Sequence, residues 1–351
     1  MLSDMSSAHV HQITNAGARV LVAKQVLRAP LPDGGALALV RKRPVGGAPR
    51  GAVVLLHGLG QNRYSWHLDQ RSLSAFLVDR GYDVFNLEMR GHGRSRGFGS
   101  ASPQGFEDYA ERDLPAALDA IRKVGHERVF LLGHSLGGAV AYAAAGATPE
   151  RFRGVVTVSG VFAWGGGTRA LSAFARLLHR AQRTHGRLGL RGGMPLRLDL
   201  VGRSMAAGLT MMENAWFLLP AEAWTPGSIE RPILHQWLTR AFDRTSGSVL
   251  AQMARWARTG SFNDNGEQRD YAQAWSRCGV PTLILAGDRD KLAHPWSDVK
   301  PAFDASSARD RTYRCFGWAS DGEQYGHVDL LVGRRAPHVV WPLIAEWLDA
   351  H

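Results

Sequence analysis

The chain has 351 residues, of which 45% are hydrophobic and 21% charged, and these proportions are typical of a soluble globular protein. No uninterrupted apolar stretch reaches the roughly 18 residues that indicate a membrane span. The first thirty residues do not resemble a signal peptide, so we expect a cytoplasmic protein. Two cysteines, Cys278 and Cys315, exclude a disulfide framework; one disulfide is possible, and buried thiols are the simpler expectation.

The formal net charge of +11 is unevenly spread along the chain. Between Arg169 and Arg203 there are eight arginines and one acidic residue, Asp199. Such a stretch fits either a solvated surface or a weak contact with anionic membrane or an acidic partner. No RNA-binding motif or zinc finger accompanies the arginines, so nucleic acid is the weakest of these options.

The predicted elements begin with two β-like runs, 19–27 and 36–41. The turn-rich segment 32–35 joins them, which predicts an antiparallel hairpin. Strands and helices alternate after this hairpin, and this pattern predicts an α/β fold with a mostly parallel central sheet and helices on both faces. The apolar runs that predict its strands are 52–56, 84–88, 128–132, 155–158, 282–285 and 312–316. The helical patterns lie at about 66–80, 106–124 and 339–348.

One region interrupts this alternation. It carries no clear strand but several helical patterns, and we interpret it as a helical cap, 163–276, inserted between the two parts of the core, 1–162 and 277–351. Its runs at helical spacing are 171–178, 233–242 and 249–256. Its large apolar residues include Met205, Met211, Met212, Trp216, Phe217 and Trp224. Most of them should pack between helices, and some should line a substrate pocket.

Ser135 is the candidate nucleophile. It lies in a Gly-x-Ser-x-Gly pentapeptide, between Gly133 and Gly137, with an apolar strand-like run before it and an alanine-rich helical run after it. A turn this tight strains the backbone at the serine, and the glycines remove Cβ atoms that would clash. The bare pentapeptide occurs by chance in many loops, but the strand and helix around it favour an exposed, reactive hydroxyl.

A serine hydroxyl needs an imidazole to accept its proton and a carboxylate to orient that imidazole. His327, which follows the last predicted strand, is the candidate base among fourteen histidines. Asp290 follows the strand 282–285 and is the preferred acid, although Asp288 in the same loop competes for this role. His294 is too close in sequence to the acid loop to replace His327, and we expect it to line the pocket or to pack.

Acyl transfer also needs N–H donors for the oxyanion that forms when a carbonyl is attacked. We expect one from Leu136, the residue after the serine, and one from Leu59, which follows His57 and Gly58 at the end of a strand. The alternative for this second loop is an ordinary strand-end turn. The segment 90–95, Arg-Gly-His-Gly-Arg-Ser, reads as a structural loop beside the site.

With the order Ser, Asp, His, the chain resembles the α/β-hydrolase superfamily. Within it the segments 106–116, 290–299 and 326–329 are similar to those of acid lipases and monoacylglycerol-lipase-like carboxylesterases. The resemblance implies hydrolysis of a carboxylic ester through an acyl-enzyme, with no metal or organic cofactor. The predicted cap shows no motif that matches a known lid, so the substrate does not carry over from the resemblance.

Other functions fit the sequence less well. An epoxide hydrolase or dehalogenase needs Asp where Ser135 stands, and a polyester synthase normally needs Cys. An aminopeptidase or an acyltransferase would use the same three residues and stays an alternative. A non-catalytic binding protein is disfavoured because all three residues are present. For an esterase, the apolar cap favours an ester of medium or longer acyl chain, or a hydroxyalkanoate oligomer.

Overall fold

The computed structural model describes residues 7–164, 195–209 and 223–351. One nine-stranded sheet runs through it in the order β1-β2-β3-β5-β4-β6-β7-β10-β11. The strands are β1 (Ala8–Ile13), β2 (Arg19–Pro30), β3 (Ala36–Pro44), β4 (Ala52–Leu56), β5 (Asp83–Glu88), β6 (Val129–His134), β7 (Phe152–Val158), β10 (Thr282–Gly287) and β11 (Arg311–Phe316). The strands β5, β4, β6, β7, β10 and β11 are mutually parallel. The predicted hairpin is formed by β2 and β3, which pair antiparallel.

Strand β1 was not predicted. It pairs antiparallel with β2 at the edge of the sheet, and most of its residues are exposed or half-buried. A strand of this kind lacks the apolar run that marks a buried strand, so its sequence resembles a loop.

The helices described are α1 (Leu73–Asp79), α2 (Gly93–Gly97), α3 (Leu114–Arg122), α4 (Leu136–Ala147), α6 (Leu198–Ala207), α8 (Arg231–Arg240), α9 (Gly247–Thr259), α10 (Tyr271–Ser276), α11 (Lys300–Ala305), α12 (Trp318–Asp321), α13 (Asp329–Val332) and α14 (Ala336–Ala350). Short 3₁₀ or π turns are η1 (Arg63–Ser65), η2 (Asp108–Asp113), η3 (Pro149–Arg151) and η4 (Pro295–Val299). The prediction that a helix starts at 66 was wrong. Helix α1 begins at Leu73 because the Ser72 side chain accepts a hydrogen bond from the Ala75 N–H and caps the helix there.

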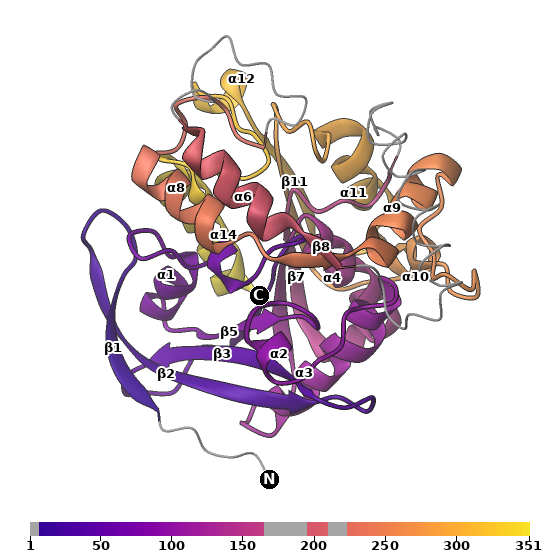
Figure 1. Ribbon diagram of the computed structural model, residues 1–351, viewed down its shortest axis with the longest axis horizontal. Helices are drawn as coiled ribbons and strands as arrows, with labels where there is room; N and C mark the ends of the chain where they lie inside the picture. Colours follow the sequence, from indigo (N-terminus) through magenta and orange to yellow (C-terminus); the bar gives the residue numbers. More distant parts are fainter. Residues whose placement is uncertain (1–6, 165–194, 210–222) are drawn as a thin grey trace.

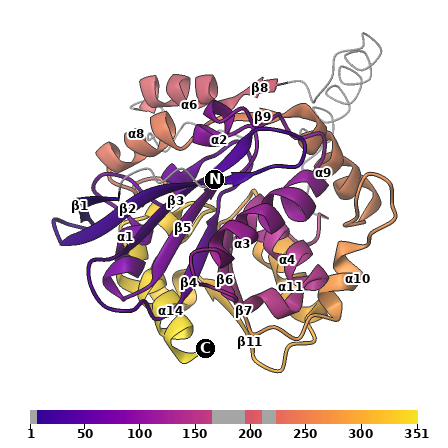
Figure 2. The same ribbon diagram turned by 90° about the horizontal axis from the view of Figure 1, so that it is seen from below.

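Helices cover both faces of the sheet (Figure 2). Alternate residues of β4 belong to two separate hydrophobic cores, since Ala52 and Val54 pack on one side and Val53 and Leu55 on the other. The first core contains side chains of α3, α4, α10 and α11, and the second contains side chains of α1, α8 and α14. A strand buried on both faces reads as a continuous apolar run, which is why the central strands were predictable.

Between β7 and β10 the chain forms α6, α8, α9 and α10 (Figure 1). The expectation that this region has no strand was wrong, because β8 (Pro195–Arg197) and β9 (Arg244–Ser246) pair antiparallel. Strands of three residues are too short to show an alternating pattern. The predicted helical runs 233–242 and 249–256 fall in α8 and α9. The run 171–178 and four large apolar residues lie outside the described residues: Met211, Met212, Trp216 and Phe217.

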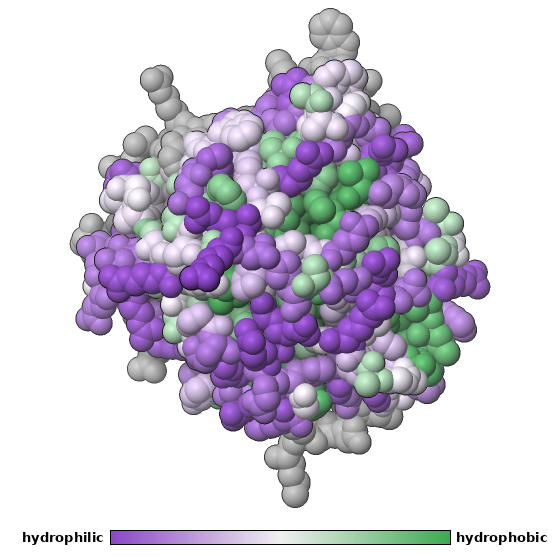
Figure 3. Space-filling view, turned by 180° about the vertical axis from the view of Figure 1, so that it is seen from behind, coloured by the Kyte–Doolittle hydropathy of each residue, from purple (hydrophilic) through white to green (hydrophobic). Residues whose placement is uncertain are grey.

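A space-filling view shows the hydropathy of one face of the molecule. Figure 3 shows mainly hydrophilic residues on the back of the molecule, with hydrophobic residues gathered in limited areas. Within the described ranges no helix combines the length and apolar character needed to cross a membrane. Cys278 is buried, Cys315 is half-buried, and both are free thiols.

Candidate active site

Ser135 occupies a sharp turn between β6 and α4. Its backbone has φ 55° and ψ −119°, a conformation that residues with a side chain rarely adopt. A Cβ on Gly133 would lie 2.3 Å from the Gly137 carbonyl oxygen, and a Cβ on Gly137 would lie 2.3 Å from the Leu56 carbonyl oxygen. Only glycine fits at both positions. The predicted strained turn is therefore present, and it leaves Ser135 partly exposed.

The turn lies where the strand order of the sheet reverses. Strand β4 has β5 on one side and β6 on the other, and a crevice forms at the carboxyl ends of parallel strands at such a point. The loop after β4 closes on the serine, because a Cβ on Gly58 would be only 3.2 Å from the Ser135 Cβ. The His57-Gly58 loop and the serine turn thus form two sides of one site.

His327 and Asp290 meet beside this turn. The His327 Nδ1 lies 2.8 Å from Asp290 Oδ2, and both side chains are buried. The other carboxylate oxygen, Asp290 Oδ1, accepts hydrogen bonds from the backbone N–H groups of Leu292 and Ala293, at 2.9 and 2.8 Å. Since the carboxylate accepts the Nδ1 proton, the Nε2 atom is the one available to a neighbouring hydroxyl.

His134, the last residue of β6, holds the loop of His327 next to the serine. Its Nε2 donates to the backbone oxygen of His327 at 3.2 Å, and the two ring centroids are 4.7 Å apart. Burial lowers the pKa of His134 well below its usual value, so its ring is neutral. No hydrogen bond between the Ser135 hydroxyl and the His327 ring is present among the described residues, and such contacts are often loose before substrate binds. Sequence reasoning did not single out His134.

Asp288, the competing acid, and two other histidines near the site, His294 and His57, do not contact the Asp290–His327 pair. Asp288 accepts hydrogen bonds from the N–H groups of Trp318 and Tyr325, at 3.2 and 2.9 Å. His294 caps η4 by accepting from the Ser297 N–H. His57 is fully buried, and desolvation lowers its pKa to about 3. Of Asp288 and Asp290, it is therefore Asp290 that contacts the His327 ring.

The two expected oxyanion donors lie at the ends of the two turns. Leu136 is the first residue of α4, and Leu59 follows Gly58 in the loop after β4. In the part of the chain that the structure describes, no acceptor pairs with the N–H of either residue. The Gln61 side chain accepts from the Gly58 N–H at 3.3 Å and helps to fix this loop. The N–H groups of Leu59 and Leu136 are therefore free to bind a developing oxyanion.

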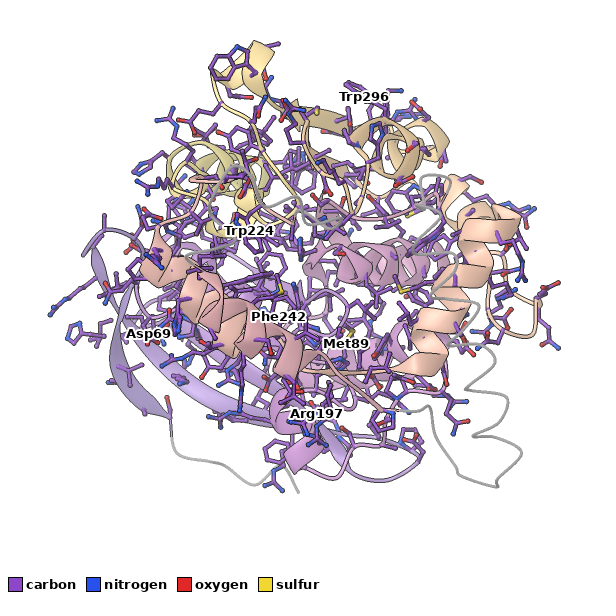
Figure 4. All side chains as sticks on the ribbon, turned by 45° about the horizontal axis from the view of Figure 1, so that its top comes forward. Asp69, Met89, Arg197, Trp224, Phe242 and Trp296 are labelled. Atoms are coloured by element: carbon purple, nitrogen blue, oxygen red, sulfur yellow. The ribbon has the colours of Figure 1, made fainter. Side chains whose placement is uncertain are left out.

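Residues of the segment between β7 and β10 contact the loops of this site. The Asp243 N–H donates to the Gly60 carbonyl oxygen at 2.7 Å, and Gln61 forms an isolated bridge with Phe242. Figure 4 labels Phe242 and, on the core side, Met89, whose N–H donates to His57 Nε2. The carboxylate of Asp243 bridges the same two parts, because it accepts from Gly93 N–H and Arg96. These contacts were not predicted, and no local pattern indicates them.

A second group of contacts joins the same segment to the loop of His327. The buried carboxylate of Asp329 accepts hydrogen bonds from Gly326 N–H, Thr225 N–H and the Ser228 hydroxyl, at 2.6, 2.9 and 2.7 Å. Burial raises the pKa of Asp329, and these hydrogen bonds oppose that effect. The loop that carries His327 is therefore bound to the segment 223–228, on which Figure 4 labels Trp224.

The segment 90–95 has structural contacts, as expected. Arg90 is buried and pairs with Asp113 and Asp33, each at 2.7 Å. Within the described residues no group of His, Cys, Asp and Glu side chains is arranged to hold a metal ion.

Comparison with known proteins identifies the fold of this chain. A family model described as the alpha/beta hydrolase fold matches residues 51–317, more than half of the chain. The chain belongs to the α/β-hydrolase fold family. The matched range of this α/β-hydrolase includes Ser135 and Asp290 and ends ten residues before His327.

Curated relatives match this α/β-hydrolase over a limited region. Lipase member K of Homo sapiens is 36% identical over 113 residues, which are 29% of this chain and 28% of that protein. Gastric triacylglycerol lipase of Rattus norvegicus is 33% identical over 128 residues, 34% of this chain and 31% of that protein. Epoxide hydrolase B of Mycobacterium tuberculosis is 35% identical over 111 residues, 32% of this chain and 29% of that protein. The alignments thus span less than a third of each relative.

Solved structures share the fold over most of the chain. The monoacylglycerol lipase of Paleococcus ferrophilus has a TM-score of 0.61 and 21% sequence identity, covering 89% of this chain and 99% of that one. An esterase of Thermogutta terrifontis has a TM-score of 0.58 and 17% identity, covering 93% of this chain and 98% of that one. At these identities the likeness concerns the fold.

Proposed function

We propose that this α/β-hydrolase is a serine esterase of the lipase type, which cleaves a carboxylic ester through an acyl-enzyme. The observation that carries the proposal is the position of Ser135. It lies on a strained turn at the carboxyl edge of the sheet, and the loop of the Asp290–His327 pair is bound to the residue before it. The lipases among the relatives support the same class of reaction.

In the proposed mechanism, Ser135 Oγ attacks the ester carbonyl while His327 Nε2 accepts its proton. Asp290 holds the imidazolium through Nδ1, and the N–H groups of Leu59 and Leu136 bind the oxyanion. The alcohol leaves with the proton from His327. Water then attacks the acyl-enzyme by the same route and releases the acid. This mechanism needs no metal or organic cofactor.

The substrate is proposed as a small-molecule or lipid-like ester of medium or longer acyl chain. Trp224 and Met205, two of the large apolar residues expected to pack or to line a pocket, contribute to the second hydrophobic core, which also contains Val328 next to His327. A serine at the nucleophile position supports an ester over an epoxide, although an epoxide hydrolase is among the relatives. An aminopeptidase or acyltransferase with the same residues would instead act on proline amides or transfer the acyl group to an added alcohol.

Labelling by a fluorophosphonate probe tests the reaction class. We expect the wild type to be labelled and to hydrolyse p-nitrophenyl octanoate faster than the acetate. Ser135→Ala should lose labelling and at least about a thousandfold in kcat, since the nucleophile is removed while the fold is kept. Circular dichroism and the thermal midpoint provide the control for folding. An unlabelled wild type, or a labelled Ser135→Ala, would contradict the proposal.

We also propose a weak contact with anionic membrane through the stretch 169–203. Most of this stretch lies outside the described residues. In the part that the structure describes, Arg197 pairs with Asp199, and Leu200 and Val201 are each 48% exposed. Such a contact should weaken with salt, because it is electrostatic. The expected result is more sedimentation with anionic than with neutral liposomes at low salt; equal sedimentation would exclude it.

A further inference from the structure

His134 stands on a central strand of the sheet. It is the last residue of β6, which lies between β4 and β7 (Figure 2). Strand β6 is paired up to its end, since Gly133 pairs with Leu56 of β4 and His134 pairs with Val158 of β7. Central strands belong to the most stable part of a fold. The His134 side chain therefore offers a fixed support to the loops around Ser135.

The His134 ring is enclosed by three neighbours. It is fully buried, and its centroid is 4.7 Å from that of the His327 ring, with the two planes tilted by 49°. A Cβ on Gly58 would lie 3.3 Å from His134 Nδ1, so the ring also touches the loop after β4. The Trp66 ring stands perpendicular to it at a centroid distance of 6.3 Å. The ring cannot turn away from His327 without moving one of these neighbours.

The contacts of His134 define its protonation state. Nε2 donates to the backbone oxygen of His327 at 3.2 Å, whereas Nδ1 is buried and has no partner. The single proton of the ring is therefore on Nε2. Burial lowers the pKa of His134 well below its usual value, and a positive charge on His327 lowers it further. The ring beside His327 is thus neutral.

A neutral aromatic ring in this place bears on the chemistry of the base. His327 becomes an imidazolium when it accepts the proton of Ser135. An aromatic ring attracts a cation that lies within about 6 Å of its centroid, and the attraction is stronger where water is excluded. Both histidines are buried, so water screens this contact little.

We propose that His134 is a positioning residue of the esterase reaction and that it acts on His327 in two ways. Its neutral ring stabilises the imidazolium, and its Nε2–H group keeps the loop of His327 against the end of β6. The inference rests on the proposed function, because it requires His327 to be the base. The buried His134 side chain touches no substrate, so it should affect turnover and the protonation of the base more than substrate affinity.

Other ionisable groups beside His327 are the same in every variant used below. In the part of the chain that the structure describes, they are Asp290 and Asp329. Asp290 accepts the hydrogen bond from His327 Nδ1. Asp329 directs its carboxylate at Gly326 N–H, Thr225 N–H and the Ser228 hydroxyl. A difference between variants at position 134 therefore reports the side chain at that position.

The pH profile of kcat/KM tests the role of the ring. Its acid limb reports protonation of the base in the free enzyme. His134→Phe keeps an aromatic ring and His134→Leu does not, while both lack the N–H donor. The acid limb of His134→Phe should stay within about 0.2 pH units of the wild type. That of His134→Leu should move to lower pH by at least about 0.4 units, because protonated His327 loses its ring contact.

Turnover tests the role of the hydrogen bond. His134→Leu should lower kcat by about tenfold to a hundredfold while KM changes less than about threefold, because the loop of His327 shifts relative to Ser135. His134→Gln keeps an N–H donor and should recover at least about threefold in kcat over His134→Leu. The matched control is His92→Leu. The buried His92 ring lies 4.8 Å from the His57 ring at a tilt of 54°, so this variant removes a similar contact away from His327 and should leave the acid limb in place.

Circular dichroism identifies any variant that fails to fold. If His134→Leu does not fold, nitrogen NMR of the labelled histidines of the wild type decides, because His134 should stay the neutral Nε2–H tautomer at pH values near 7. Fluorophosphonate labelling separates this inference from the proposed function, since an unlabelled wild type would remove the reaction itself. A labelled wild type combined with equal acid limbs in His134→Phe and His134→Leu, or with a charged His134 ring, would overturn this inference alone.

Discussion

Asp290 and Asp288 lie two residues apart in the loop after β10, yet their contacts differ completely. Asp290 meets the His327 ring, whereas Asp288 holds the backbone of Trp318 and Tyr325. The sequence alone left this choice open, because both residues follow the same strand. The contact of Asp290 with the His327 ring, 37 positions along the chain, distinguishes the two residues, because Asp288 makes no such contact among the described residues.

We therefore expect two conservative substitutions to lower kcat by very different amounts. Asp290→Asn should lower kcat about 10⁴-fold, because an amide cannot hold the imidazole in the required tautomer. Asp288→Asn should lower it less than tenfold, because an amide oxygen still accepts one of the two backbone hydrogen bonds. Steady-state rates on one ester measure both. A larger loss in Asp288→Asn than in Asp290→Asn would show that the acid is misassigned.

At the scale of the elements, the turn from β6 to α4 depends on close backbone contacts. Gly137 lies against the Leu56 carbonyl oxygen of β4, so a methyl group there must push the strand and the helix apart.

Gly137→Ala should destabilise the protein by about 1–3 kcal/mol and should also reduce kcat, since it shifts the serine. Gly279→Ala is the control, because a Cβ there meets nothing within 4 Å. Its unfolding free energy should stay within about 0.5 kcal/mol of the wild type. Chemical denaturation compares the two, and equal stabilities would contradict the packing argument.

The elements also show what a sequence can predict. Buried strands such as β4 and β10 are continuous apolar runs, and the turn at Ser135 has the Gly-x-Ser-x-Gly pattern. The mostly parallel sheet was therefore predicted correctly. The edge strand β1 and the short pair of strands β8 and β9 lack such a pattern. The same holds for the site: Ser135, Asp290 and His327 follow recognisable strands, but His134, Asp243 and Asp329 act through partners roughly a hundred or more positions away.

At the scale of the whole molecule, Asp243 joins the segment between β7 and β10 to the loops after β4 and β5. Burial alone would raise its pKa, but hydrogen bonds from Arg96, Arg244 N–H and Gly93 N–H outweigh burial and lower the pKa to about 2. A carboxyl whose folded pKa is depressed contributes stability that is complete above its unfolded pKa of about 4 and is lost as the pH falls toward 2. The shift corresponds to at most about 3 kcal/mol, and partial exposure of the carboxylate reduces this value.

Asp243→Asn should lower the thermal midpoint by a constant amount between pH 7 and pH 5, and the difference from the wild type should shrink below pH 4. Asp69→Asn is the control, since Asp69 pairs with Arg240 of the same segment at 2.8 Å, but both side chains are exposed. Exposed pairs contribute about 0–1 kcal/mol, so this variant should melt close to the wild type. A difference for Asp243→Asn that persists unchanged at pH 3 would contradict the assignment.

Two groups of contacts join the segment between β7 and β10 to the loops of the proposed site. One joins the backbone of Asp243 to the loop of Leu59, and the other joins Thr225 and Ser228 to Asp329 beside His327. A rigid movement of the segment 223–246 would displace the loop of Leu59 and the loop of His327 together, and these carry a proposed oxyanion donor and the proposed base. Substitutions within 223–246 should therefore change turnover as well as substrate affinity, and substrate must enter without separating these two attachments.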